Sequence, residues 1–237
     1  MIIESGHIRQ AIARSGIALA GLLVAGIALA HGVEERDAMF LERNAGQALL
    51  AFAYLGAKHM ITGYDHLLYL FGVIFFLYRP KDIAVYVTLF AVGHSITLLG
   101  GVLADINVNV YLVDAVIGLS VAYKAFENLD GFRKFFNVSP NPKIAVFLFG
   151  LVHGFGLATK LQVLTLSAEG LVANIISFNV GVEIGQLLAL VFLLVLINAL
   201  RASGSFERKA SVFNFVLMFA GFSLATYQLA GFFLVTT

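Results

Sequence analysis

The chain has 237 residues, of which 60% are hydrophobic and only 12% are charged, against about 25% charged residues in an ordinary soluble domain. This composition predicts a polytopic membrane protein. The lack of cysteine excludes disulfides and thiolate metal sites. A net charge of +1 with no basic-aromatic patch gives no reason to expect a nucleic-acid partner.

The first apolar segment has two possible roles. Arg9 and Arg14 precede an apolar stretch that ends at Ala28-Leu29-Ala30, a pattern typical of a secretory signal. Cleavage after Ala30 would expose His31 as the new N-terminus. A retained anchor helix over residues 1–30 is an equally simple interpretation. In either case we expect residues 31–237 to form a single transmembrane domain.

Long apolar runs with few breakers predict an all-α fold, a transmembrane bundle of about seven helices, or six if the first segment is removed. The runs fall at about 16–30, 46–62, 65–78, 83–103, 109–128, 144–161, 171–199 and 211–234. Only Gly63 and Tyr64 separate the second run from the third, which is short for a crossing of ~20 residues. We therefore interpret these two runs as one broken crossing.

The basic residues predict an orientation, because Lys and Arg near helix ends favour the cytoplasmic side. With the N-terminus inside, ten Lys and Arg residues lie in cytoplasmic loops, whereas Arg36 and Arg43 lie outside. A retained N-terminus is then cytoplasmic and the C-terminus is outside, as in a multi-pass protein of a bacterial-type inner membrane. The bilayer is the expected environment, and the sequence does not indicate an oligomeric state.

Ionisable side chains inside these runs are the strongest functional signal, because they are costly in a bilayer. His59 and His66 are seven residues apart, which places both on one stripe of a continuous helix, with Asp65 beside them. Imidazole and carboxylate groups bind divalent metals such as nickel, cobalt or zinc. The rise of a helix per residue places His94, His153 and Glu183, from three other predicted helices, near the middle of the membrane. His59 lies nearer the outer face, at an entrance or a second site. The predicted metal ligands are His59, Asp65, His66, His94, His153 and Glu183.

Each polar group also has a structural interpretation. Asp65 could cap the helix after Gly63, and the histidines could form interhelical hydrogen bonds. Glu183 could be held by a histidine alone. We assign supporting or pathway roles to Asp114, Ser95, Asn179 and Gln186, with Asp114 as an outer waypoint or a simple interfacial residue. Lys124 and Glu127 have the spacing of an ordinary surface ion pair.

Taken together, these motifs resemble the HupE/UreJ family of small polytopic membrane proteins. The resemblance covers about residues 50 to 200. It rests on the segment His59 to His66, Gly93-His94-Ser95-Ile96-Thr97-Leu98, Ile117-Gly118-Leu119-Ser120, Glu127-Asn128, Phe149 to Gly156 and Phe178 to Gln186. It implies several transmembrane helices, a divalent-metal site and a role in nickel or cobalt permeation.

Three functions remain open at this point. The first is a divalent-metal permease or uptake accessory, with helix breaks at Gly63 and Gly154 that permit rearrangement. The second is an intramembrane zinc hydrolase, in which Glu183 or Asp65 acts as general base. The third is a structural or assembly protein with a buried metal. The first is our leading hypothesis, so we expect no catalytic residues.

Overall fold

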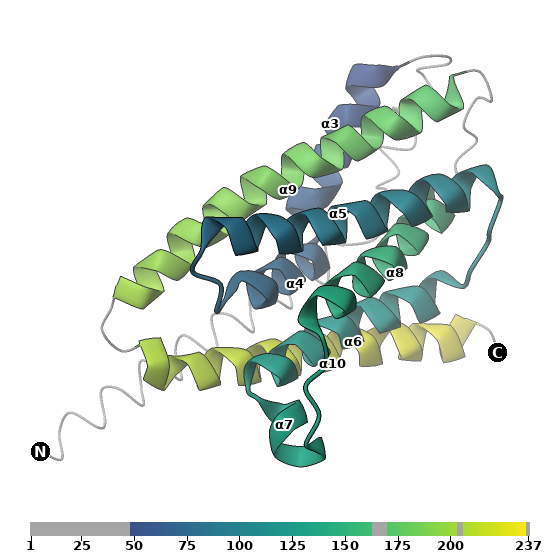
Figure 1. Cartoon of the computed structure of the whole chain (residues 1–237). Coiled ribbons are helices and arrows are strands. Elements are labelled where there is room, and N and C mark those ends of the chain that lie inside the picture. Colours follow the sequence, from purple (N-terminus) through teal and green to yellow (C-terminus); the bar gives the residue numbers. More distant parts are fainter. Residues whose placement is uncertain (1–47, 163–169, 203–205, 236–237) are drawn as a thin grey trace, which may run out of the picture. The chain divides into compact units, whose positions relative to one another are not determined.

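The computed structural model describes residues 48–162, 170–202 and 206–235, all within one compact unit, Val33–Thr237. The predicted signal or anchor segment, 1–30, lies outside the described residues, as does His31. Every regular element in the described ranges is a helix, which confirms the all-α prediction. The helices are α3 (Leu49–Thr62), α4 (Tyr64–Ile74), α5 (Pro80–Leu103), α6 (Val110–Asn128), α7 (Gly131–Phe136), α8 (Pro142–Gln162), α9 (Leu171–Ala202) and α10 (Phe206–Val235) (Figure 1).

Four of the described helices, α5, α8, α9 and α10, are long and apolar enough to cross a membrane. This number is smaller than the predicted seven for physical reasons. The first predicted crossing is not described, and α3 and α4 are each too short to span alone. Helix α6 has 19 residues but carries three charged side chains, Asp114, Lys124 and Glu127.

The predicted break between the second and third apolar runs is confirmed. Helix α3 ends at Thr62, Gly63 is extended with φ −70° and ψ 98°, and α4 begins at Tyr64. Helix α4 is shorter than the predicted run 65–78, because the chain turns after Ile74 to enter α5 at Pro80. The short helix α7 lies in the polar stretch 129–143, where no helix was expected.

Three helix pairs make the most extensive contacts: α3 with α9, α5 with α8, and α6 with α10. Glycines line each contact. A Cβ on Gly181 of α9 would collide with the backbone of Ala53 in α3, and one on Gly118 of α6 would collide with the backbone of Ala225 in α10. Such close backbone approach is typical of membrane helices, where packing replaces the hydrophobic driving force.

Gly154 shows the same use of glycine and corrects one prediction. We expected a helix break there, but α8 continues from Pro142 to Gln162. A Cβ on Gly154 would instead meet the Thr97 hydroxyl and the His94 carbonyl of α5. The Thr97 hydroxyl donates a 2.7 Å hydrogen bond to the Leu151 carbonyl across this contact. The glycine therefore brings two helices together rather than interrupting one.

Helix α4 is the element shared by these pairs. It packs against α6 and also contacts α3, α5, α9 and α10. Its residues His66, Tyr69 and Ile74 are all buried. The short half-helix thus places its polar first turn in the interior of the bundle, where side chains from neighbouring helices can reach it.

The glycine contacts can be tested with a matched pair of alanine substitutions. Gly181→Ala should destabilise the protein by about 1–3 kcal/mol, because the new methyl group overpacks the α3–α9 contact. Gly100→Ala should be neutral or stabilising, since a Cβ at Gly100 has no heavy atom within 4 Å and alanine favours the helix. Thermal unfolding in detergent measures both. Equal unfolding midpoints for the two variants would contradict the packing model.

Candidate functional site

His66 is the centre of the candidate site. It is buried in the first turn of α4, with 4% of its surface exposed. Its ring centroid lies 5.0 Å from that of His59, 5.1 Å from that of His153 and 6.3 Å from that of His94. These four residues, which we call the histidine cluster, come from α3, α4, α5 and α8. The predicted convergence of histidines from separate helices is therefore present in the fold.

The break at Gly63 sets the contact between His59 and His66. Gly63 closes α3 by donating its N–H to the His59 carbonyl at 2.8 Å. A Cβ on Gly63 would lie 2.8 Å from His66 Nδ1 and 3.1 Å from Asp65 Oδ1. The ordinary φ of Gly63 does not demand glycine, but the crowding does. The structure thus places His59 in the cluster, although depth along the sequence suggested an entrance or a second site.

Asp65 orients the central histidine. Its Oδ1 lies 2.9 Å from His66 Nδ1 and also accepts the His66 backbone N–H at 2.9 Å. The carboxylate thus makes two contacts. The contact with the backbone is the capping role that we considered above, and the other is with the His66 side chain. With Nδ1–H donated to Asp65, the Nε2 atom of His66 carries the free lone pair. Metal-bound histidines are held by the same carboxylate contact.

His153 and His94 complete the cluster from α8 and α5, and each is 1% exposed. His153 Nδ1 lies 2.7 Å from the Phe149 carbonyl, which fixes this nitrogen as the donor because a carbonyl can only accept. Within the described ranges, no hydrogen-bond partner is found for Nε2 of His59, His66 and His153, or for either ring nitrogen of His94. Buried polar groups are normally paired, so this accumulation needs an explanation.

Aromatic side chains surround the cluster. The Phe90 ring lies 5.0 Å from that of His153 and stacks on His94 at 6.3 Å, and the Tyr69 ring lies 5.5 Å from that of His153. Sequence reasoning missed both residues, although helical spacing could have found them: Phe90 precedes His94 by four residues and Tyr69 follows His66 by three.

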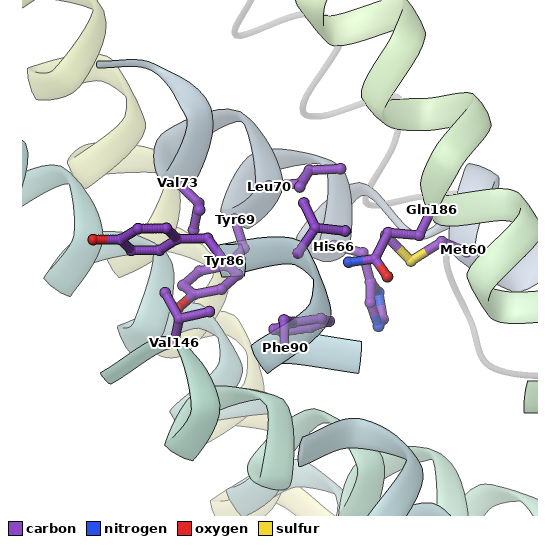
Figure 2. A pocket seen from close by; sticks show the side chains of 10 residues that line it. Met60, His66, Tyr69, Leu70, Val73, Tyr86, Phe90, Val146 and Gln186 are labelled. Carbon is purple, nitrogen blue, oxygen red and sulfur yellow. The ribbon is translucent and has the colours of Figure 1, made fainter. Parts of the chain in front are cut away.

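A small cavity of about 10 Å³ lies beside His66, near the lower limit for holding one water molecule. Figure 2 shows its lining, with the Gln186 amide and the Met60 thioether beside His66. Gln186 is buried and lines the same cavity as His66, and its supporting role stays a prediction. Asn179 and Ser95 are half-buried on α9 and α5.

The structure separates Glu183 from the histidine cluster. Its side chain is exposed on α9, one turn before the buried Gln186. The sequence could not distinguish the two, because depth along a helix says nothing about the direction in which a side chain points. The assignment of Glu183 as a ligand stays a prediction, and the fold gives it no contact with the four rings.

Each of the two carboxylates of α6 is paired with a lysine. Asp114 binds the Lys160 ammonium through both oxygens, at 2.8 and 3.1 Å. Lys124 Nζ lies 3.2 Å from Glu127 Oε1, and the Lys124 side chain is only 8% exposed. We expected a surface pair, but Lys124 is buried and the Glu127 side chain is only 20% exposed. The sequence pattern missed this because i, i+3 spacing does not report which helix face is covered.

The convergence of the four histidine rings does not by itself make a metal site. Among the described residues, no group of three or more His, Asp or Glu side chains is arranged to hold one metal ion. The ring centroids of His59 and His153 nevertheless lie 5.0 and 5.1 Å from that of His66. Two imidazoles on one tetrahedral ion have a centroid separation of about 5 Å when the metal–nitrogen distances are ~2.0–2.1 Å. The His94 ring is farther away, at 6.3 Å.

Arg201 of α9 fixes the far end of the half-helix that carries His66. Its Nη2 donates hydrogen bonds to the carbonyls of Phe75 at 2.6 Å and Leu77 at 3.0 Å, where the last turn of α4 leaves acceptors without helical partners. Its guanidinium also lies 4.0 Å from the Tyr78 ring centroid. The C-terminal end of α4 is thus held by α9.

Arg201→Met should therefore destabilise the protein by about 1–3 kcal/mol, because partly buried carbonyls lose their donor. Arg133→Met is the matched control, since Arg133 is exposed and its ion pair is with Asp130, the residue before α7. An exposed pair of this kind contributes about 0–1 kcal/mol. Thermal unfolding in detergent compares the two. An Arg201 variant as stable as the control would show that this contact does not anchor α4.

Comparison with known proteins identifies the family. The model of the HupE / UreJ protein family matches residues 35–236, which includes every residue of the histidine cluster. No curated protein and no solved structure shows a match to the chain. Because the family match extends over nearly the whole sequence and the fold contains apolar helices long enough to span a bilayer, the chain belongs to the HupE/UreJ family of membrane proteins.

Proposed function

We propose that the histidine cluster binds a divalent transition-metal ion and that the protein takes part in moving this ion across the membrane. The family is associated with nickel and cobalt uptake or with urease and hydrogenase maturation. The observation that carries the proposal is the set of buried imidazole nitrogens that lack a partner in the described residues. Each unpaired buried group costs about 1–3 kcal/mol, and a metal ion would satisfy several at once.

The chemistry of the donors supports a transition metal. Neutral imidazole suits nickel, cobalt, copper and zinc, whereas magnesium and calcium prefer oxygen ligands. Asp65 and the Phe149 carbonyl each bind one nitrogen of a histidine and leave its Nε2 available. Binding would require a shift of the His94 ring toward His66, because these rings are 6.3 Å apart. The choice among nickel, cobalt and zinc rests with experiment.

The arrangement of helices supports movement of the ion. A broken helix next to a buried polar site is a recurring feature of transporters, in which the two halves can shift separately. Here α3 and α4 supply His59 and His66 on opposite sides of Gly63. Asp114 is the proposed waypoint toward the cluster, and it would accept the ion when Lys160 moves away. Imidazole ligands release a metal when they are protonated, which permits exchange.

Metal binding tests the premise directly. Full-length purified protein should bind Co²⁺ or Ni²⁺, and both His66→Gln and His153→Gln should weaken this binding at least about ten-fold, since removing a ligand costs no less than removing its orienting partner. Asp82→Asn is the control, because this side chain is exposed in the first turn of α5 and is no predicted ligand. Equilibrium dialysis with elemental analysis gives affinity and stoichiometry. Binding that is unchanged in both histidine variants would contradict the proposal.

Uptake into vesicles separates the candidate functions. Reconstituted protein should carry Co²⁺ or Ni²⁺ across the bilayer, with loss of uptake in the His66→Gln variant. Metal that is bound but never crosses would favour a structural or assembly role. Zinc-dependent cleavage of a lipid or peptide without uptake would favour the intramembrane hydrolase.

Asp65→Asn tests the orienting contact. The amide loses the charge that fixes the His66 tautomer, so metal affinity should fall about 10–100-fold while the ligating rings remain. Asp82→Asn is the control, because Asp82 is exposed in the first turn of α5. Titration with Co²⁺ measures both variants. An affinity equal to that of the wild type would leave Asp65 with a capping role alone.

A further inference from the structure

Helix α7, which connects α6 to α8 (Figure 1), carries aromatic and basic side chains side by side on the surface. Phe135 is 77% exposed and Phe136 is 66% exposed. Arg133 and Lys134, which precede them, are exposed as well. Large apolar rings gathered on a surface mark a region that contacts another apolar phase. Together with Lys and Arg, they are typical of helices that lie at the membrane–water interface.

The polar stretch 129–143, which contains α7, lies on the side of the membrane that we predict to be cytoplasmic, and it carries a net charge of +2. Arg133 pairs with Asp130 at 2.7 Å. The Lys134 ammonium donates one hydrogen bond to the Leu129 carbonyl at 2.7 Å, which leaves two N–H donors for another acceptor. The charged residues of the stretch are Asp130, Arg133, Lys134 and Lys143.

An open apolar groove of about 450 Å³ begins beside α7 and is lined by α6, α8 and α10. This volume is in the range of ligand pockets. Tyr123 and Phe126 of α6 line the groove, and both rings lie 4.8 Å from the ring of Phe132 in α7. Phe126 also stacks with Phe135 at 6.0 Å. The groove and the exposed aromatic surface of α7 are therefore continuous.

The groove has the length of one bilayer leaflet. Its lining on α6 runs from Val116 to Phe126, and these ten residues rise about 15 Å along the helix axis. Half of the ~30 Å hydrocarbon core is the same distance. Another helix, with a diameter of ~10 Å, would occupy about 1,200 Å³ over this length, far more than the groove provides. An acyl chain is narrow enough to enter it.

A second apolar groove, of about 430 Å³, provides a contrast. It is lined by α6 and α8 and continues from Val116 toward the start of α6. The link that precedes α6 there, 104–109, contains Asp105 and no Lys or Arg. Lys160 reaches this end of α6, but both oxygens of Asp114 bind its ammonium. Both grooves can hold an acyl chain, whereas exposed positive charge lies beside the first one.

We propose that α7 and the groove from Val116 to Phe126 form a binding site for an anionic phospholipid. One acyl chain occupies the groove, and the Arg133 and Lys134 side chains bind the phosphate headgroup. Phe149 lines the same groove, and its carbonyl is the partner of His153 Nδ1, so the lipid site borders the histidine cluster. Lipid binding here does not depend on a metal ion.

Competition between two lipids tests the site. Full-length purified protein is equilibrated with equal amounts of phosphatidylglycerol and phosphatidylcholine that have the same acyl chains, and native mass spectrometry counts the bound lipids. The wild type should prefer phosphatidylglycerol at least about five-fold, the contribution of one basic residue near an anionic surface. Arg133→Gln with Lys134→Gln should abolish this preference. Arg79→Gln with Lys81→Gln is the control, because it removes two exposed basic residues outside the groove.

A tryptophan placed in the groove tests the position of the acyl chain. Leu119 lines the groove and is 43% exposed, so Leu119→Trp should fill the groove without entering the core. This variant should bind one phosphatidylglycerol fewer, and the lipid should raise its unfolding midpoint less than that of the wild type, because a ligand stabilises the folded state by binding it. Leu112→Trp is the matched control, since Leu112 is 41% exposed and lines the second groove.

Several results would overturn the lipid site. One is equal retention of the two lipids by the wild type. Another is an equal loss of preference in both double variants, which would indicate general surface charge. Equal effects of Leu119→Trp and Leu112→Trp would remove the acyl chain from this groove. A wild-type dimer that becomes a monomer in Leu119→Trp would assign the groove to a second copy of the chain. None of these measurements uses a metal, so their failure leaves the proposed function untouched.

Discussion

The candidate site depends on the break at Gly63. Without it, His59 and His66 would lie on one helical stripe, nearly two turns apart. The extended glycine lets α4 start in a new direction, so that the two rings meet at 5.0 Å. Only glycine fits, because a Cβ would crowd His66 Nδ1 and Asp65 Oδ1. The orientation of the central histidine and the course of the half-helix therefore share one cause.

The glycine contacts between the longer helices bring further histidines to the site that begins at the Gly63 break. Because α5 and α8 approach closely at Gly154, His94 and His153 enter the interior from two adjacent backbones. The same contact uses the Thr97 hydroxyl to satisfy the Leu151 carbonyl. Apolar packing and polar placement are thus achieved by one arrangement, in which small residues fix the distance between helices and larger ones project into the space around α4.

The charged side chains of α6 form ion pairs in this interior. Its carboxylates at Asp114 and Glu127 are each paired with a lysine, so the net charge buried at each end is small. Neutral pairs reduce the cost of burial. In the histidine cluster, Asp65 is the carboxylate in contact with His66.

The sequence by itself determined the all-α membrane class and the break at Gly63, and it predicted a shared depth for His66, His94 and His153, because apolar runs, helix breakers and costly buried charges are all local signals. It did not determine that Glu183 faces outward, that Lys124 is buried or that α8 continues through Gly154. Those features depend on which helix packs against which face. Only the tertiary structure, in which glycines select the helix pairs and leave α4 at their centre, decided them.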